Sequence, residues 1–143
     1  MIVKIKKLHE DAVVPTYATM GSACFDIRAI TSIGNVMICK DSSQVFNTGL
    51  AFEVPENHVM LVFSRSGHGF NSDVRLANCT GIIDSDYRGE LLVKLRTDGN
   101  GFTVGNGDRI AQGMIIPVER VNFTEVDALA DTARGDGGIG STG

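Results

Sequence analysis

Residues 49–63 read GLAFEVPENHVMLVF, and this stretch decides the fold class. Two apolar runs, 49–54 and 59–63, flank Pro55-Glu56-Asn57-His58, a group of turn-forming residues. Each run has the length typical of a strand and is too short for a stable helix. Comparable runs follow one another at intervals of about 8–12 residues, at 1–8, 36–39, 45–48, 91–95, 102–104 and 110–118. The sequence therefore predicts an all-β barrel or sandwich.

Helical and flexible segments are few. The stretch 64–70, SRSGHGF, predicts one or two helical turns capped by serine, and 124–130 predicts another turn. From Asp131 the apolar pattern stops and glycine becomes frequent. We therefore predict a β domain over residues 1–130 and a flexible Gly-rich C-terminal arm over residues 131–143.

Composition excludes several classes of protein. The chain has 143 residues, 15.3 kDa and a net charge of −4, which suits one domain and does not favour binding to nucleic acid. No apolar run approaches the ~20 residues of a membrane span, and the first ten residues lack the apolar region of a signal peptide. The three cysteines form no C-x-x-C motif, so neither a zinc site nor a complete disulfide framework is expected. We expect a cytoplasmic protein with reduced thiols.

The densest polar cluster is GIIDSDYRGE at residues 81–90. Strand alternation would place Asp84, Asp86 and Arg88 on one side and Ser85 and Tyr87 on the other, unless the chain bends here. A carboxylate held in such a bend can act as a general base towards water. The alternative is an Asp-rich turn with solvated charges.

Three further segments contain polar groups that suit a binding site. In Ser64-Arg65-Ser66-Gly67, hydroxyl, guanidinium and backbone N–H groups could hold a phosphate, although a plain cap with a surface arginine is the alternative. Asp26 lies inside an apolar strand and needs a partner such as Arg28, a backbone donor or an ion. Gln112 either belongs to a site or faces solvent. The three histidines, at 9, 58 and 68, have no ligand spacing and are assigned to the surface or loops.

The C-terminal residues 134–143 read RGDGGIGSTG. Gly135, Gly137 and Gly140 formally match G-x-G-x-x-G, but no strand precedes them and no helix can follow, so a dinucleotide-binding fold is excluded. Converging N–H groups, the hydroxyls of Ser141 and Thr142, and the guanidinium of Arg134 suit an anion. A disordered tail is the alternative.

In order and spacing, five segments resemble the motifs of the trimeric dUTP diphosphatases (dUTPases). They read GSACFDIRA (21–29), SRSGHGF (64–70), NCTGIIDSDYRGEL (78–91), DRIAQGMIIP (108–117) and RGDGGIGSTG (134–143). The resemblance implies a jelly-roll-like β-barrel that forms a homotrimer, in which the arm crosses to a neighbouring subunit. It also implies Mg²⁺-dependent hydrolysis of dUTP to dUMP and diphosphate by attack of water on the α-phosphorus, a reaction of nucleotide metabolism that keeps uracil out of DNA.

The resemblance further implies residue roles. Asp84 would activate the water and contact the 3′-hydroxyl, and Tyr87 would pack under the sugar and exclude a 2′-hydroxyl. The uracil would be bound by Asn78, Gly81, Ile82, Ile83 and Leu92. The phosphates would be held by Arg65, Ser66 and Gly67, with Gln112 placing the α-phosphate and water. Asp26 would meet Mg²⁺ through a water, the ion being held mainly by the triphosphate. The closing arm would contribute Arg134, Ile139, Gly140, Ser141 and Thr142.

The sequence departs from the family pattern at a few positions. Ile139 stands where the family usually has an aromatic residue that stacks on uracil, and Ser64 stands where proline is common. His68 and Cys79 occupy positions that are often apolar. None of these changes removes a charged or catalytic group.

Two alternatives to a dUTPase stay open. A dCTP deaminase, or a bifunctional deaminase–diphosphatase, of the related fold would need an acid–base carboxylate beside the base, whereas residues 78–80 are Asn, Cys and Thr. The second alternative is a dUTP-responsive regulator that binds another protein, although the chain shows no inserted loop. In either case we expect a nucleotide ligand and neither a nucleic-acid nor a membrane partner.

Overall fold

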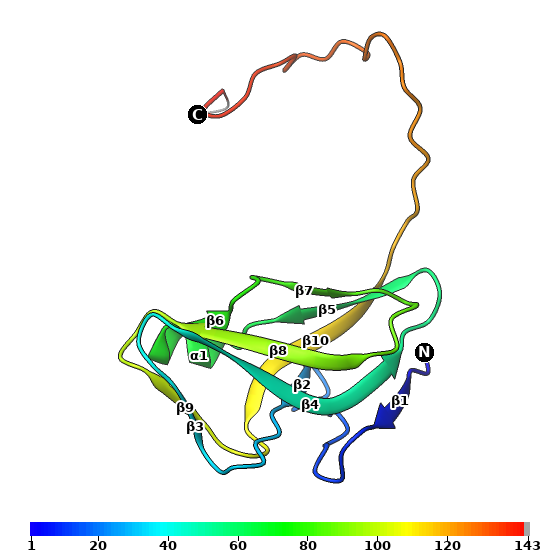
Figure 1. The fold of residues 1–143 in the computed structure, drawn as a ribbon. Helices are drawn as coiled ribbons and strands as arrows, with labels where there is room; N and C mark the ends of the chain where they lie inside the picture. The colour runs from blue at the N-terminus through cyan, green and yellow to red at the C-terminus, as the bar shows by residue number, and fades with distance from the viewer. Residues whose placement is uncertain (142–143) are drawn as a thin grey trace.

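The computed structural model describes residues 1–141, and these fold almost entirely into strands (Figure 1). A single short helix, α1 (Ser66–Ser72), interrupts them within this range. The strands are β1 (Lys4–Lys7), β2 (Phe25–Arg28), β3 (Val36–Ile38), β4 (Ser43–Glu53), β5 (His58–Phe63), β6 (Val74–Leu76), β7 (Gly81–Ile83), β8 (Glu90–Thr97), β9 (Phe102–Val104) and β10 (Arg109–Pro117). The predicted all-β class is confirmed.

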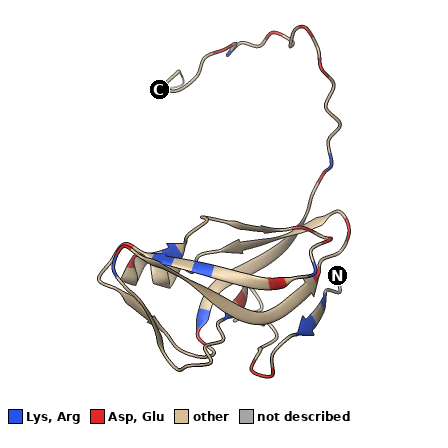
Figure 2. Cartoon of the chain, viewed as in Figure 1, with Lys and Arg blue, Asp and Glu red and all other residues tan. Residues whose placement is uncertain are grey.

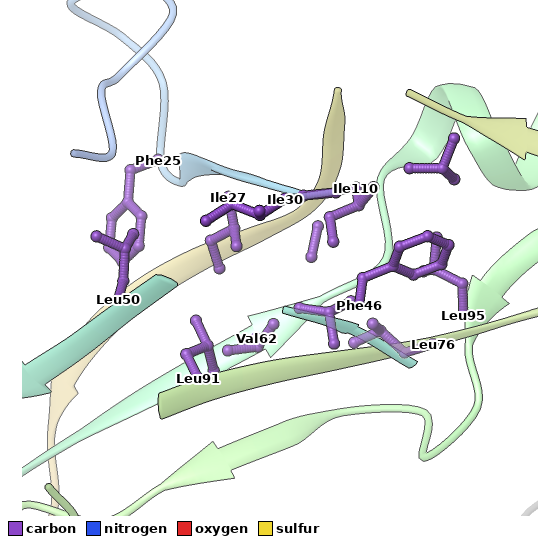
Figure 3. Packing of buried hydrophobic residues seen from close by; sticks show 14 of the residues in the cluster. Phe25, Ile27, Ile30, Phe46, Leu50, Val62, Leu76, Leu91, Leu95 and Ile110 are labelled. Carbon is purple, nitrogen blue, oxygen red and sulfur yellow. The ribbon is translucent and has the colours of Figure 1, made fainter. Parts of the chain in front are cut away.

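Two four-stranded antiparallel sheets enclose the core. Their strand orders are β1-β4-β8-β6 and β2-β10-β5-β7, and β3 pairs with β9 separately. Figure 3 shows side chains from both sheets meeting between them, among them Ile27, Val62 and Leu91, all buried. Among the described residues the strand pairing does not close into one barrel, so the expected barrel takes the form of two facing sheets.

The turn predicted at 55–58 connects the two sheets, and its last residue, His58, is already the first residue of β5. β4 ends at Glu53 in one sheet and β5 begins at His58 in the other. Asn57 adopts a φ of 57°, which asparagine tolerates better than most residues, and the His58 N–H donates to the Pro55 carbonyl over 3.2 Å. The two apolar runs that flank this turn therefore face each other across the core instead of pairing.

A bulge joins the two strands expected at 45–48 and 49–54 into one, β4. The pairing of β4 with β8 shifts register between Asn47 and Ala51, and Gly49 has a φ of 65° there. A side chain at Gly49 would place its Cβ only 2.8 Å from the Cβ of Ala12. The Glu90 carboxylate accepts hydrogen bonds from the Gly49 N–H at 2.7 Å and from Asn47 Nδ2 at 2.9 Å. This carboxylate therefore satisfies the Gly49 backbone donor that the bulge removes from the ladder, and it also accepts from the Asn47 side chain.

The prediction of a serine cap on the first helix is wrong. The N-cap of α1 is Arg65, which makes no side-chain capping hydrogen bond. The Ser64 hydroxyl instead accepts a hydrogen bond from the Leu76 N–H over 2.8 Å, so a partner in β6 replaces the local one. The helical turn expected at 124–130 is also absent, since so short a segment needs tertiary packing to become helical.

The chain leaves the sheets after β10. The Val118 N–H donates to the Asn57 carbonyl over 2.9 Å, and residues 119–141 then run away from the sheets without strand or helix (Figure 1). This C-terminal segment begins earlier than the arm expected from Asp131. The division into a β domain and an arm that closes over a site stays a prediction. No described helix is long and apolar enough to cross a membrane.

Candidate functional site

The first part of the candidate site is a hollow of about 430 Å³, here called the arginine hollow. It lies where β2, the start of α1 and β10 meet, so it unites segments more than 80 residues apart in the sequence. Of the predicted site residues it contains Asp26, Arg65, Ser66, Gly67 and Gln112. The remaining lining residues are Ala18, Ser22, Ala23, Cys24 and Arg109.

A bulge in β10 brings Arg109 and Gln112 to the same hollow. Residues three apart on a regular strand point to opposite faces. Between Arg109 and Ala111, however, the register against β2 shifts, and one extra residue of β10 is accommodated. Sequence reasoning did not single out Arg109, because alternation alone gives no sign of such a bulge.

Asp26 is held by two guanidinium groups. Its Oδ1 lies 3.5 Å from Arg65 Nε and its Oδ2 lies 3.3 Å from Arg109 Nη1, and only 17% of the side chain is exposed. The expected partner Arg28 instead donates to the Gly107 carbonyl over 2.7 Å. Two guanidiniums against one carboxylate leave the hollow with a net positive charge, which suits an anion with several oxygen atoms.

Neutral groups complete the arginine hollow. Gln112 donates from Nε2 to the Ser64 carbonyl over 3.0 Å, which fixes the orientation of the amide and leaves its oxygen as an acceptor. Burial raises the pKa of the Cys24 thiol, so this residue is an uncharged thiol at neutral pH. The charge of the hollow therefore depends on Asp26 and the two arginines.

The second part of the site is an apolar hollow of about 350 Å³ between β7 and β8. The residues of the strands and loops that are predicted to bind uracil all lie here, namely Asn78, Gly81, Ile82, Ile83 and Leu92, whereas Ile139 lies on the C-terminal segment. Its other lining residues are aliphatic except for Lys94: Val45, Val62, Leu76, Leu91 and Val93. A Cβ at Gly81 would lie 3.0 Å from the Cβ of Val62, so the close approach of β5 and β7 favours glycine. Aliphatic walls with one amide suit a planar ring that has a polar edge.

Asp84 and Tyr87 lie in a turn that follows β7. The Tyr87 N–H donates to the Asp84 carbonyl over 3.2 Å, so the chain bends here and strict alternation does not apply. The Asp84 carboxylate is exposed, and no hydrogen bond or ion pair to it occurs within residues 1–141. Tyr87 donates its hydroxyl hydrogen to the Glu90 carbonyl over 3.0 Å, and its ring lies against Gly89.

The predicted site residues therefore fall into separate groups within one chain. The two hollows share no lining residue, and Asp84 and Tyr87 line neither. Four more predicted residues lie on the C-terminal segment, far from the sheets (Figure 1): Arg134, Ile139, Gly140 and Ser141. Thr142 lies outside the described residues. Figure 2 shows acidic and basic residues interspersed along the visible strands.

Comparison with known proteins identifies the family. The dUTPase family model matches residues 10–143. The deoxyuridine 5'-triphosphate nucleotidohydrolase of Nautilia profundicola is 42% identical over 144 aligned positions, covering 100% of this chain and 99% of the relative. The enzyme of the same name from Helicobacter hepaticus is also 42% identical, covering 100% and 89%.

The fold agrees with this result. The dUTPase of Staphylococcus bacteriophage 80alpha, solved with dUPNHPP, superposes with a TM-score of 0.90 at 24% identity and covers 99% of this chain and 98% of the phage chain. A mutant of the same phage enzyme, also with the bound analogue, gives a TM-score of 0.89. Since the family model and its relatives match almost the whole length, the chain belongs to the dUTPase family.

Proposed function

We propose that this protein hydrolyses dUTP to dUMP and diphosphate, and so keeps uracil out of DNA. The observation that supports this most strongly is the arginine hollow. In a chain of this family, Asp26, Arg65, Ser66, Gly67 and Gln112 from three separate segments line one hollow of net positive charge. The relatives at 42% identity are named for the same reaction.

The substrate would bind through both hollows. Arg65 and Arg109 would pair with the phosphate chain, assisted by donors of Ser66 and Gly67 at the rim of the same hollow. The uracil would enter an apolar hollow, where Asn78 and the backbone of Gly81–Ile83 would bind its polar edge. Guanidiniums match the geometry of phosphate oxygens, and aliphatic walls exclude water from the base.

The arginine hollow also fits a magnesium ion that arrives with the triphosphate. Asp26 is its one carboxylate, and residues 1–141 contain no cluster of three or more side chains able to hold a metal. A single carboxylate suits Mg²⁺, which keeps several waters and takes further oxygen ligands from phosphates. When bound, the ion would neutralise charge that develops on the phosphate oxygens. Asp26 would hold it through a water and give up part of its pairing with Arg65 and Arg109.

The chemistry itself would require one base. Asp84 would accept a proton from a water that attacks the α-phosphorus, and diphosphate would leave from the opposite side. The exposed carboxylate has no competing ion pair among the described residues, so it is free to bind a water. Gln112 would help to orient that water and the α-phosphate through its amide oxygen. Tyr87 would pack under the deoxyribose and exclude a 2′-hydroxyl.

We further propose that three copies of the chain complete each site. Within one chain the arginine hollow and the apolar hollow share no lining residue, and Asp84, which directly follows Ile83 of the apolar hollow, does not line the arginine hollow. The C-terminal segment extends away from the sheets (Figure 1). A closed C₃ arrangement would let the turn of one subunit meet the hollow of a second. The C-terminal segment of the third subunit would then close over the phosphates with Arg134, Gly140, Ser141 and Thr142, and over the base with Ile139.

Parallel assays with dUTP, dCTP, dTTP and UTP test the reaction. Diphosphate and dUMP should form from dUTP at a rate far above the other three, in a reaction that requires Mg²⁺ and stops on chelation. Release of ammonia from dCTP would replace the proposal with a deaminase. Binding of dUTP without hydrolysis would instead favour a regulatory protein, which a pull-down with and without dUTP would identify.

A further inference from the structure

His68 is a partly buried titratable residue of α1 that the proposed mechanism does not use. Its ring packs against Phe102 of β9, with centroids 4.9 Å apart and planes at 55°. The expectation that this histidine lies at the surface or in a loop is wrong, because it belongs to α1 and packs against β9. Its Nδ1 atom is buried and has no hydrogen-bond partner among residues 1–141.

The other ring nitrogen contacts the arginine hollow. Arg65 Nη1 lies 3.1 Å from His68 Nε2. A guanidinium has only donors, so Nε2 must accept this hydrogen bond and the ring proton must reside on Nδ1. The contact therefore requires a neutral imidazole in one particular tautomer.

Arg65 has three anchors, and they are not equivalent. It contacts the Asp26 carboxylate at 3.5 Å, the Arg109 carbonyl at 3.2 Å and His68 at 3.1 Å. If Asp26 turns towards a magnesium–triphosphate complex, the two neutral acceptors remain. Both can hold the guanidinium without competing with phosphate for its charge.

We propose that His68 is a positioning residue, whose neutral ring holds the Arg65 guanidinium in the orientation that binds the phosphate chain. This inference rests on the proposed function. The ring does not touch substrate in this account; it acts through Arg65.

Burial of the ring and the charges around it favour its neutral form. Burial is the largest cause that lowers the pKa of His68 below its ordinary 6.5. The charges of Arg65 and Arg109 lower it further, and Asp108 acts in the opposite direction. Phe102, the other group in contact with the ring, is uncharged. Protonation would place an N–H against the Arg65 donor and add a second cation beside it, so Arg65 would lose this anchor in acid.

Nitrogen NMR of the histidine rings tests the geometry without any substrate. His68 should show a protonated Nδ1 and an unprotonated Nε2. His9 is an internal control with the opposite tautomer. Its Nδ1 accepts a hydrogen bond from the Asp11 N–H at 3.1 Å, so the proton of its neutral ring lies on Nε2. Substitution of His9 and His58 in turn assigns the signals. A His68 ring protonated at Nε2 at neutral pH overturns the proposal.

Kinetics of His68→Leu and His68→Gln test the consequence. Leucine keeps an apolar side chain against Phe102 but removes the acceptor, and should raise the KM for dUTP by about two- to tenfold, the effect of one lost hydrogen bond, with little change in kcat. Glutamine retains an acceptor oxygen and should stay within about twofold of the wild type. Equal KM values for all three proteins overturn the proposal.

The pH dependence separates positioning from simple packing. As the pH falls below 6.5, the KM of the wild type should rise more than that of His68→Gln, which cannot titrate. The terminal phosphate of the substrate titrates in the same range, so only the difference between the two proteins is informative. If the KM of the wild type and the KM of His68→Gln rise equally as the pH falls, the proposal is overturned. Failure of the wild type to hydrolyse dUTP would refute the proposed function instead, and the ring nitrogens would still decide whether His68 accepts from Arg65.

Discussion

Replacement of Gly89 by alanine tests whether the position of Tyr87 sets the preference for deoxyribose. A methyl group at residue 89 would overlap the Tyr87 hydroxyl oxygen and Cζ, and would lie 2.9 Å from Cε2. The φ angle of Gly89 is not positive, so alanine fits the backbone. The ring must therefore move, and its 3.0 Å hydrogen bond to the Glu90 carbonyl must break.

The size of the effect follows from that hydrogen bond. Loss of this hydrogen bond costs about 0.5–1.5 kcal/mol, and about 1.4 kcal/mol corresponds to a factor of ten. The population of molecules with the Tyr87 ring in its original position should therefore fall by at least about two- to twelvefold. Exchange of glycine for alanine restricts the unfolded chain and so stabilises the fold by about 0.4–1 kcal/mol. Because this gain offsets the cost of the lost hydrogen bond, the melting temperature should change little. The expected result is a fall of the same size in the ratio of kcat/KM for dUTP to that for UTP.

The control is the same substitution in a Tyr87→Ala background. If the methyl group acts through the Tyr87 ring, Gly89→Ala should not change the dUTP/UTP ratio of kcat/KM in the Tyr87→Ala background. The two single variants and the double variant form a double-mutant cycle that measures this. A wild-type dUTP/UTP ratio in the single variant, or an undiminished effect in the double variant, would refute the reasoning.

Three further predictions concern the base and the C-terminal segment. Asp84→Asn should lower kcat by about 10²–10⁴-fold with little change in melting, because the exposed carboxylate has no described partner; near-normal turnover of a folded trimer would contradict this. Deletion of residues 134–143 should abolish most activity but leave the trimer mass by light scattering and the melting temperature nearly unchanged; a monomeric full-length protein would contradict the shared site. Ile139→Phe should raise kcat/KM by about two- to tenfold through stacking, and Ile139→Gly should lower it; equal losses in both variants would show a site shaped around isoleucine.

Local signals in the sequence are sufficient to predict β1, β4, β5, β8 and β10, which belong to the two sheets. The apolar runs at 49–54 and 59–63 and the turn between them are present, because proline and asparagine favour that turn in any context. By contrast, β6 and β7 were not predicted. Each of these strands has only three residues. The chain between them turns at Cys79, which has a φ of 64°, and cysteine is not a residue type from which such a turn is predicted.

Site residues were predictable by type but not by partner. Asp26 was recognised as an acid that needs compensation, yet its partners Arg65 and Arg109 come from distant segments that only the fold brings together. The sequence predicts a serine cap for α1, but the Ser64 hydroxyl accepts its hydrogen bond from the Leu76 N–H of β6. The lack of ligand spacing assigns His68 to the surface or a loop, and the packing of Phe102 on its ring is not visible in the sequence because β9 lies far along the chain. Tertiary contacts decided each of these outcomes.

The most direct test of the account is complementation between two inactive variants. Asp84→Asn chains and chains lacking residues 134–143 would be mixed in equal amounts, unfolded, refolded together and assayed for diphosphate release from dUTP. If one subunit supplies Asp84 and another supplies the C-terminal segment, random trimers should have both intact groups in about a quarter of their sites, since each group is intact with a chance of about one half. The expected activity of the mixture is about a quarter of the wild-type activity. Activity no higher than that of the separate variants would show that one chain supplies both groups and would contradict the shared site.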